Sequence, residues 1–308
     1  MGNTLLITFG CSWTYGVGVN YEFGMSQKEL EQSAWDENIC NSLSWRGILS
    51  ETHALDNLNF SVGGSSNQLQ FRRAEEFFSS SRFKNLKKSH HRIIVVWGIT
   101  STSRNELFDN DAGIPVSFLY HQYKKPIAKL LLVDHYNHEW EVFRLCRQML
   151  HWEQYLNFLG VELHWFDTFN THNYHKNDLA FKKTHPDEQK YQAVAGPDWP
   201  SYDNFCAGNF LKTPDHILEE IYNIYPDTET PKCMIDINVN PRDLMSWLAI
   251  RNGMTNIDSD YHTSSWSNDS NRVKYLVNKN LLNPLTYHPT AHTHRILADF
   301  FSLKLNLL

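Results

Sequence analysis

The sequence TLLITFGCSWTYG, residues 4–16, passes from an apolar run into a turn of small residues that presents Ser12. An apolar run that ends in glycine and serine is typical of a strand that exposes a nucleophile at its carboxyl end in α/β hydrolytic folds. The alternative is an ordinary strand-to-helix turn in which Ser12 or Thr14 caps the helix. The rest of the chain has to decide between these two interpretations.

Three further apolar runs follow the first, and helical patterns lie between them. The four runs with strand composition are residues 4–9, 55–62, 92–97 and 161–166. Helices are predicted over 67–78 and roughly 140–159, where apolar residues recur at helical intervals. Strands that alternate with helices indicate a parallel sheet covered on both faces. We therefore expect an α/β fold with three layers, α/β/α, around a central parallel sheet.

The residues that directly follow the four runs are predicted to be neighbours, because the carboxyl ends of parallel strands meet at one edge of a sheet. They are Ser12, the turn 61–66, the segment 98–104 and Asp167. A further candidate, His288, comes just before a predicted C-terminal helix. We expect these residues to form one site.

Residues 168–287 do not keep the alternation of strand and helix. The segment is rich in Asn, Asp, His, Tyr and Trp, and two helices are predicted in it. Thr213 caps one, and Asp243 caps the other, which ends at Gly253. Because so long a connection without function is uncommon, we interpret 168–287 as an irregular insertion or lid beside the catalytic edge. Residues 1–308 then form a single domain.

Composition argues against several classes of protein. The 308 residues are 41% hydrophobic, enough for one large core. The net charge of -6 disfavours a nucleic-acid or anionic-membrane partner. The five cysteines lack CxxC spacing and the sixteen histidines lack carboxylates at ligand spacing, so no disulfide framework, metal or cofactor is expected. With no leader before the first strand and no run of about 18 apolar residues, a cytoplasmic protein is expected.

Four segments together resemble the SGNH (GDSL-type) hydrolase superfamily, the serine esterases and deacetylases on a flavodoxin-like sheet. GCSWTYG at 10–16 resembles the first block of that family, with Ser12 at the nucleophile and Cys11 where Asp is usual. NFSVGGSS at 59–66 is similar to the second block and places Gly64 at the oxyanion-hole glycine. HPTAHTH at 288–294 resembles the fifth block, with His288 as the general base, and SWRGIL at 44–49 resembles the helix after the first.

The chemistry implied by the resemblance needs this set of residues. The Ser12 hydroxyl requires a base within about 3 Å, and histidine titrates in the right range. The oxyanion of the tetrahedral intermediate requires donors that are fixed in advance, which the backbone N–H groups of Ser12 and Gly64 would supply.

The sequence departs from the family pattern at two positions. Leu285 stands where the family carries the Asp that orients the histidine, and Ile99 stands where it carries an oxyanion Asn. Thr100, Ser101 or Arg104 are candidate replacements for the oxyanion donor. Asp167 or a backbone carbonyl is the candidate to orient His288. We therefore expect a Ser12–His288 dyad with substituted support.

The function implied is hydrolysis of small acyl esters, in particular O-acetyl groups of a glycan. Trp13 and Asn67 are candidate substrate contacts, and core packing is the alternative for Trp13. Two rival functions remain open. One is a non-catalytic carbohydrate-binding or virion structural protein, since GCSWTYG starts and GGSSN turns also resemble bacteriophage-encoded chains, which would make the location virion-associated. The other is an acyltransferase that uses the same serine.

Overall fold

The computed structural model describes residues 3–102, 104–109, 114–119, 138–168, 232–237, 243–255 and 271–307. The strands are β1 (Thr4–Phe9), β2 (Asp56–Asn59), β3 (Arg92–Ile99), β4 (Arg104–Asp109), β5 (Ile114–Leu119) and β6 (Glu162–Asp167). The helices are α1 (Ser12–Tyr15), α2 (Gln27–Ser33), α3 (Glu37–Leu43), α4 (Trp45–His53), α5 (Asn67–Phe78), α6 (Ser81–Ser89), α8 (His138–Phe158), α13 (Leu244–Arg251), α14 (Asn271–Asn278) and α15 (Ala291–Lys304).

The central sheet is parallel throughout, with strand order β2-β1-β3-β6. Residues 233–235 lengthen it at the β6 edge, where the Trp165 N–H donates to the Cys233 carbonyl (2.9 Å) and the Ile235 N–H donates to the Trp165 carbonyl (2.8 Å). β4 and β5 form a separate antiparallel pair. The chain crosses from one side of β1 to the other between β2 and β3, so the end of β1 lies at the point where such sheets bind ligands.

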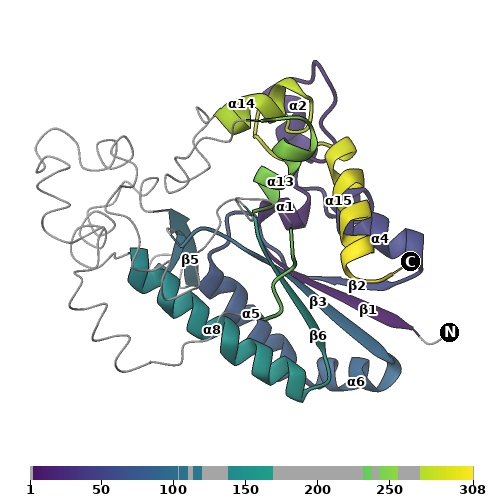
Figure 1. The fold of residues 1–308 in the computed structure, drawn as a ribbon, viewed down its shortest axis with the longest axis vertical. Coiled ribbons are helices and arrows are strands. Elements are labelled where there is room, and N and C mark those ends of the chain that lie inside the picture. Colours follow the sequence, from purple (N-terminus) through teal and green to yellow (C-terminus); the bar gives the residue numbers. More distant parts are fainter. Residues whose placement is uncertain are drawn as a thin grey trace, which may run out of the picture.

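Two apolar cores cover the two faces of the sheet. Alternate residues of β1 and β3 point to opposite faces, as the period of two in a strand requires. One core joins the sheet to α5, α6 and α8, and the other joins it to α4, α13, α14 and α15. Figure 1 shows α5, α6 and α8 on one side of the strands and α4 with α15 on the other. The predicted three-layer α/β/α fold is confirmed.

The predicted elements match the structure closely where the pattern was apolar. The strand at 4–9 and the helix at 67–78 have the predicted bounds. The second strand is shorter than predicted, although the N–H groups of Phe60 and Val62 still donate to the carbonyls of Thr8 and Gly10. The sequence patterns did not predict α2, α3, α6, α14 or the β4–β5 pair.

The predicted insertion at 168–287 contributes to the core where the structure describes it. Residues 233–235 extend the sheet, and α13 and α14 pack with α15 in one core. The helix capped by Asp243 is confirmed, since its carboxylate accepts from the Ser246 N–H at 2.9 Å. The helix predicted at Thr213 lies outside the described residues, and the role of the insertion as a lid stays a prediction. No helix in the described part of the chain is long and apolar enough to cross a membrane.

Candidate active site

Ser12 is the first residue of α1, directly after the turn that ends β1. Cys11 occupies the N-cap position, and Gly16 ends the short helix in a left-handed conformation. Glycine is required at position 10, because a Cβ there would lie 2.2 Å from the Thr14 Oγ1. Ser12 is only 7% exposed. The sequence therefore holds the hydroxyl on a tight, well-packed turn.

A second turn, residues 61–66, is tied directly to the turn of Ser12. The Gly10 carbonyl accepts from the Val62 N–H at 3.0 Å and from the Ser65 hydroxyl at 2.9 Å. Gly64 has a φ of 71°, which favours glycine, and no described atom lies within 4 Å of where its Cβ would be. The two turns predicted to supply oxyanion donors are thus joined by hydrogen bonds, with open space beside Gly64.

Thr100 and Asn67 bind each other at the end of β3. The Thr100 N–H donates to the Asn67 Oδ1 at 3.0 Å, and the Asn67 Nδ2 donates to the Thr100 carbonyl at 2.9 Å. This pairing fixes the start of α5 against the end of β3. Ile99, which stands at the position of the family's Asn, is fully buried in the core.

His288 is presented by a turn that Asn283 organises. The Asn283 Oδ1 accepts from the Thr286 N–H at 2.7 Å, while its N–H and Nδ2 both donate to the His288 carbonyl. Tyr287 adopts a positive φ of 57°, a strained conformation for a non-glycine residue. Sequence reasoning missed Asn283, although an Asn-Pro pair that starts a turn was the available signal.

The turn of His288 packs against the segment that follows α1. A Cβ at Gly18 would lie 3.1 Å from the Asn283 Nδ2 and 3.9 Å from the His288 Cβ, so only glycine lets the two segments approach this closely. Leu285 joins a small apolar cluster with Val17 and Leu30. This packing explains why the position of the missing Asp carries an apolar residue here.

The surroundings of His288 favour the neutral imidazole. Burial, with a smaller contribution from the nearby positive charge of Arg104, lowers its pKa to about 4. A backbone hydrogen bond with Thr286 acts in the opposite direction and raises the pKa. Which of the two predicted groups orients the ring, Asp167 or a backbone carbonyl, stays a prediction.

Arg104 is a buried charged group that acts on both halves of the candidate site. It begins β4, is 6% exposed, and its guanidinium donates a hydrogen bond to the side chain of Cys11. Its charge also acts on His288. Burial lowers the pKa of Arg104, but a guanidinium remains protonated at neutral pH. A buried positive charge therefore acts both on Cys11, next to Ser12, and on His288.

Asp167 ends β6 and is fully buried, next to Asp243. Asp243 caps α13 and receives hydrogen bonds from Arg272 and Ser246. Burial raises the pKa of Asp243, and the negative charge of Asp167 adds to this effect. Asp167 is thus part of the edge of the sheet, and its role in orienting His288 stays a prediction.

Two other residues singled out from the sequence lie in the core. Trp13 is 1% exposed and packs with the helices that cover one face of the sheet, which favours the core-packing alternative. His294 is fully buried on α15, where its Nδ1 accepts from the Trp45 N–H at 3.2 Å. His294 therefore fixes the start of α4.

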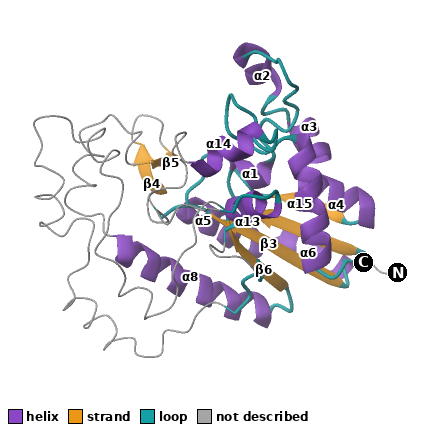
Figure 2. Cartoon of the chain, turned by 45° about the horizontal axis from the view of Figure 1, so that its top comes forward, coloured by secondary structure: helices purple, strands orange, loops and turns teal. Residues whose placement is uncertain are grey.

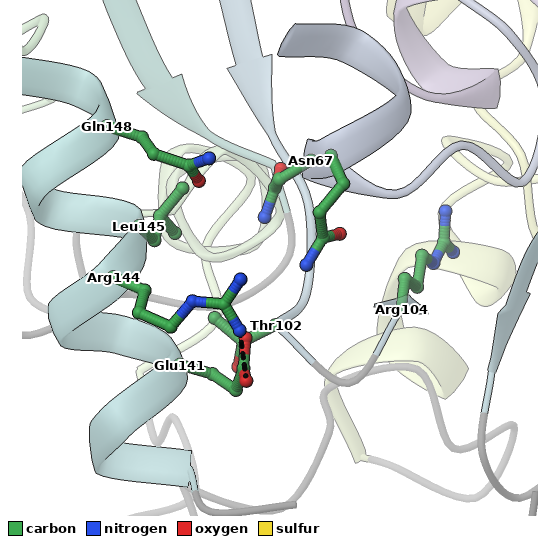
Figure 3. A pocket seen from close by; sticks show the side chains of 8 residues that line it. Asn67, Thr102, Arg104, Glu141, Arg144, Leu145 and Gln148 are labelled. Carbon is green, nitrogen blue, oxygen red and sulfur yellow. Dashed lines mark hydrogen bonds and ion pairs between the residues drawn. The ribbon is translucent and has the colours of Figure 1, made fainter. Parts of the chain in front are cut away.

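A polar pocket adjoins the candidate site between α5 and α8 (Figure 3). Its empty volume is about 260 Å³, and its lining residues are Asn67, Gln68, Thr102, Arg104, Glu141, Arg144, Leu145 and Gln148. Arg144 donates to Glu141 at 3.1 Å, and the Arg104 side chain lies apart from this pair. Amide and guanidinium groups line most of the pocket, which has room for about one water molecule. Among the described residues, no group of three or more His, Cys, Asp or Glu could hold a metal ion.

No protein-family model and no curated protein matches this chain. Several solved structures are similar to it. A lipolytic protein of the G-D-S-L family from Desulfitobacterium hafniense DCB-2 shares 10% identity, with a TM-score of 0.36 over 98% of this chain and 99% of that one. The acetyl xylan esterase Est2A from the rumen bacterium Butyrivibrio proteoclasticus shares 8% identity, with a TM-score of 0.36 over 100% of this chain and 66% of that one.

The third similar structure is LAE5, an alpha/beta hydrolase enzyme from the metagenome of Lake Arreo, Spain. It shares 11% identity, with a TM-score of 0.37 over 100% of this chain and 96% of that one. The similarity concerns the α/β fold alone. Function is therefore inferred from the residues of the site.

Proposed function

We propose that this chain is a serine carboxyl-ester hydrolase for small acyl groups, in particular O-acetyl groups on a glycan. Ser12 is the nucleophile and His288 is the general base. The observation that carries the proposal is the buried guanidinium of Arg104, which is hydrogen-bonded beside Ser12 and acts electrostatically on His288. A fixed positive charge at that place stabilises an oxyanion that forms when Ser12 attacks.

The reaction proceeds through an acyl-enzyme. His288 accepts the proton of the Ser12 hydroxyl while the oxygen attacks the ester carbonyl carbon. The backbone N–H groups of Ser12 and Gly64, with Arg104, bind the negative oxygen of the tetrahedral intermediate. The alcohol leaves with the proton that His288 returns, and water then attacks the acyl group with His288 again as base.

The support around His288 sets an upper limit on the rate. Loss of the orienting carboxylate in a serine protease triad costs about 10⁴ in kcat. A backbone carbonyl is the first candidate for the group that orients the ring. The Arg104 charge disfavours the imidazolium while it favours the oxyanion. Asp167 is the second candidate for the orienting group. We expect a slow enzyme whose transition-state stabilisation comes mainly from the oxyanion donors.

The polar lining of the pocket between α5 and α8, rather than its volume, favours a hydroxyl-rich alcohol half for the substrate. Gln68 and Gln148 line it together with Arg144. Amide groups donate to and accept from hydroxyls, which suits a glycan better than a fatty chain. Asn67 reaches this pocket too, although its amide binds the Thr100 backbone.

Hydrolysis of p-nitrophenyl acetate tests the proposal. Wild type should hydrolyse the ester, and Ser12→Ala and His288→Ala should each lose the activity. Thr14→Ser is a matched control on the same helix that keeps a hydroxyl in place. The esterase proposal fails if Ser12→Ala hydrolyses the ester as fast as wild type.

The low basicity of His288 also favours a second candidate function. In this candidate the chain is a carbohydrate-binding protein, virion-associated or not, that retains the fold but hydrolyses no ester. Wild type without esterase activity that still binds an acetylated sugar would support this candidate. An acyltransferase would instead transfer the acetyl group to an added sugar faster than to water.

A further inference from the structure

Trp35 is an exposed aromatic residue held rigidly beside the candidate oxyanion turn. It lies between α2 and α3, which extend beyond α1 and away from α5 and α8 (Figure 2), and it is 55% exposed. The tip of its ring lies over Gly63, where a Cβ would come within 2.0 Å of the Trp35 Cη2. The ring also contacts Tyr15 at the end of α1, with centroids 6.0 Å apart.

The backbone on both sides of Trp35 is fixed. The Ala34 carbonyl accepts from the Gly18 N–H at 3.1 Å, which ties the segment to the turn after α1. Asp36 caps α3, where its carboxylate accepts from the N–H groups of Asn38 and Ile39. The exposed ring is therefore preorganised and does not depend on a flexible loop for its position.

The position of the ring relates it directly to the candidate chemistry. Gly63 precedes Gly64, and consecutive Cα atoms lie about 3.8 Å apart. Tyr15 belongs to the same four-residue helix as Ser12. Single exposed aromatic residues are common on protein surfaces. Trp35 differs from them because glycine at position 63 makes room for its ring.

We propose that Trp35, supported by Tyr15, is the surface on which the pyranose ring of an acylated sugar stacks while its ester lies at Ser12. This proposal rests on the proposed esterase function. The exposed face of an indole is flat, apolar and electron-rich, and it complements the C–H groups on one face of a pyranose.

A comparison of two acetate esters tests this assignment. The probes are fully acetylated methyl β-xylopyranoside, which has a ring, and ethyl acetate, which has none. Trp35→Ala should lower kcat/KM for the xyloside by about five- to tenfold, mainly through KM, and should change kcat/KM for ethyl acetate by less than about twofold. Trp35→Phe should retain most of the xyloside activity.

The matched control is Phe158→Ala. Phe158 is 84% exposed at the end of α8, which leads into the amino end of β6 and so lies away from the site. This variant should hydrolyse both esters like wild type. Equal losses on both esters in Trp35→Ala would indicate a structural role and overturn the proposal. A loss confined to phenyl acetate, used as a third probe, would also overturn it, since the surface would then bind aromatic alcohols.

Binding without turnover separates this proposal from the esterase function. In the Ser12→Ala background, calorimetric titration should show that Trp35→Ala weakens binding of the acetylated xyloside about five- to tenfold. If wild type hydrolyses no ester but the titration gives this result, the esterase function fails and the stacking surface stands. Equal affinity with and without Trp35 refutes the stacking surface, whatever the activity.

Discussion

His294 makes the stability of this protein strongly dependent on acid. The side chain is fully buried, and its Nδ1 accepts from the Trp45 N–H, so the ring is neutral in the native state. Burial, with smaller contributions from Arg46 and His288, lowers its pKa from the ordinary value of 6.5 to about 3. The unfolded chain, in contrast, takes up the proton at the ordinary pKa.

The sign and size of the effect follow from these two values. Below pH 6.5 the unfolded state binds a proton that native His294 excludes, so the free energy of unfolding falls as the pH falls. The loss continues down to the folded pKa near 3. On going from pH 7 to pH 4, roughly 2.5 pH units lie below the unfolded pKa, and at about 1.36 kcal/mol per unit this costs about 3 kcal/mol.

Urea unfolding of His294→Asn at pH 7 and pH 4 measures this contribution. Asparagine keeps an acceptor for the Trp45 N–H but does not titrate. The drop in unfolding free energy between the two pH values should be about 3 kcal/mol smaller in the variant than in wild type. His292→Asn, an exposed histidine on the same helix, is the control and should keep the wild-type drop. Equal drops in His294→Asn and wild type would refute the reasoning.

Three further predictions follow from the candidate site. His288 must be neutral to act as a base, and its pKa is about 4, so kcat/KM for an acetate ester should reach half its plateau near pH 4. A half-point near pH 6.5, the ordinary pKa of histidine, would contradict this. Arg46→Met should lower the free energy of unfolding, measured in urea, by about 2–4 kcal/mol, because the buried guanidinium donates to carbonyls at the end of α1. A loss under about 1 kcal/mol would contradict this structural role. Gly63→Ala should displace the Trp35 ring and lower kcat/KM for the xyloside as much as Trp35→Ala does. The double variant should show no further loss, and additive losses would contradict the link between the two residues.

The sequence predicted the layers of the fold because burial determines its apolar pattern. β1 and β3 lie between two cores, so both carry near-continuous apolar runs. α5 packs one face on the sheet, and Phe71, Ala74 and Phe78 mark that face at helical spacing. The rule that strand ends meet at one edge then brought Ser12, the turn 61–66 and the segment 98–104 to one region of the fold.

Elements that bury few side chains could not be predicted in the same way. α2 buries only Leu30 among its residues, and α3 buries only Cys40, so neither has an apolar period. The short segment 233–235 joins the sheet mainly through backbone hydrogen bonds at the edge of β6, which leave little trace in the side chains.

The support of the candidate site was the hardest part to predict. Thr286 acts on His288 through its backbone, and a backbone carbonyl has no signature in the sequence. The position of Trp35 over Gly63 depends on the path of the chain between α2 and α3. Leu285 stands where the resemblance predicts an Asp. In the structure it belongs to a small apolar cluster with Val17, which the sequence pattern does not indicate.

Labelling of the wild-type protein with a serine-directed fluorophosphonate tests the central claim most directly. Intact mass and peptide mapping should show one phosphonate adduct, on Ser12. Ser12→Ala should not be labelled, and His288→Ala should be labelled much more slowly. Wild type that stays unlabelled, or that carries the label on another residue, would contradict the assignment of Ser12 as an activated nucleophile.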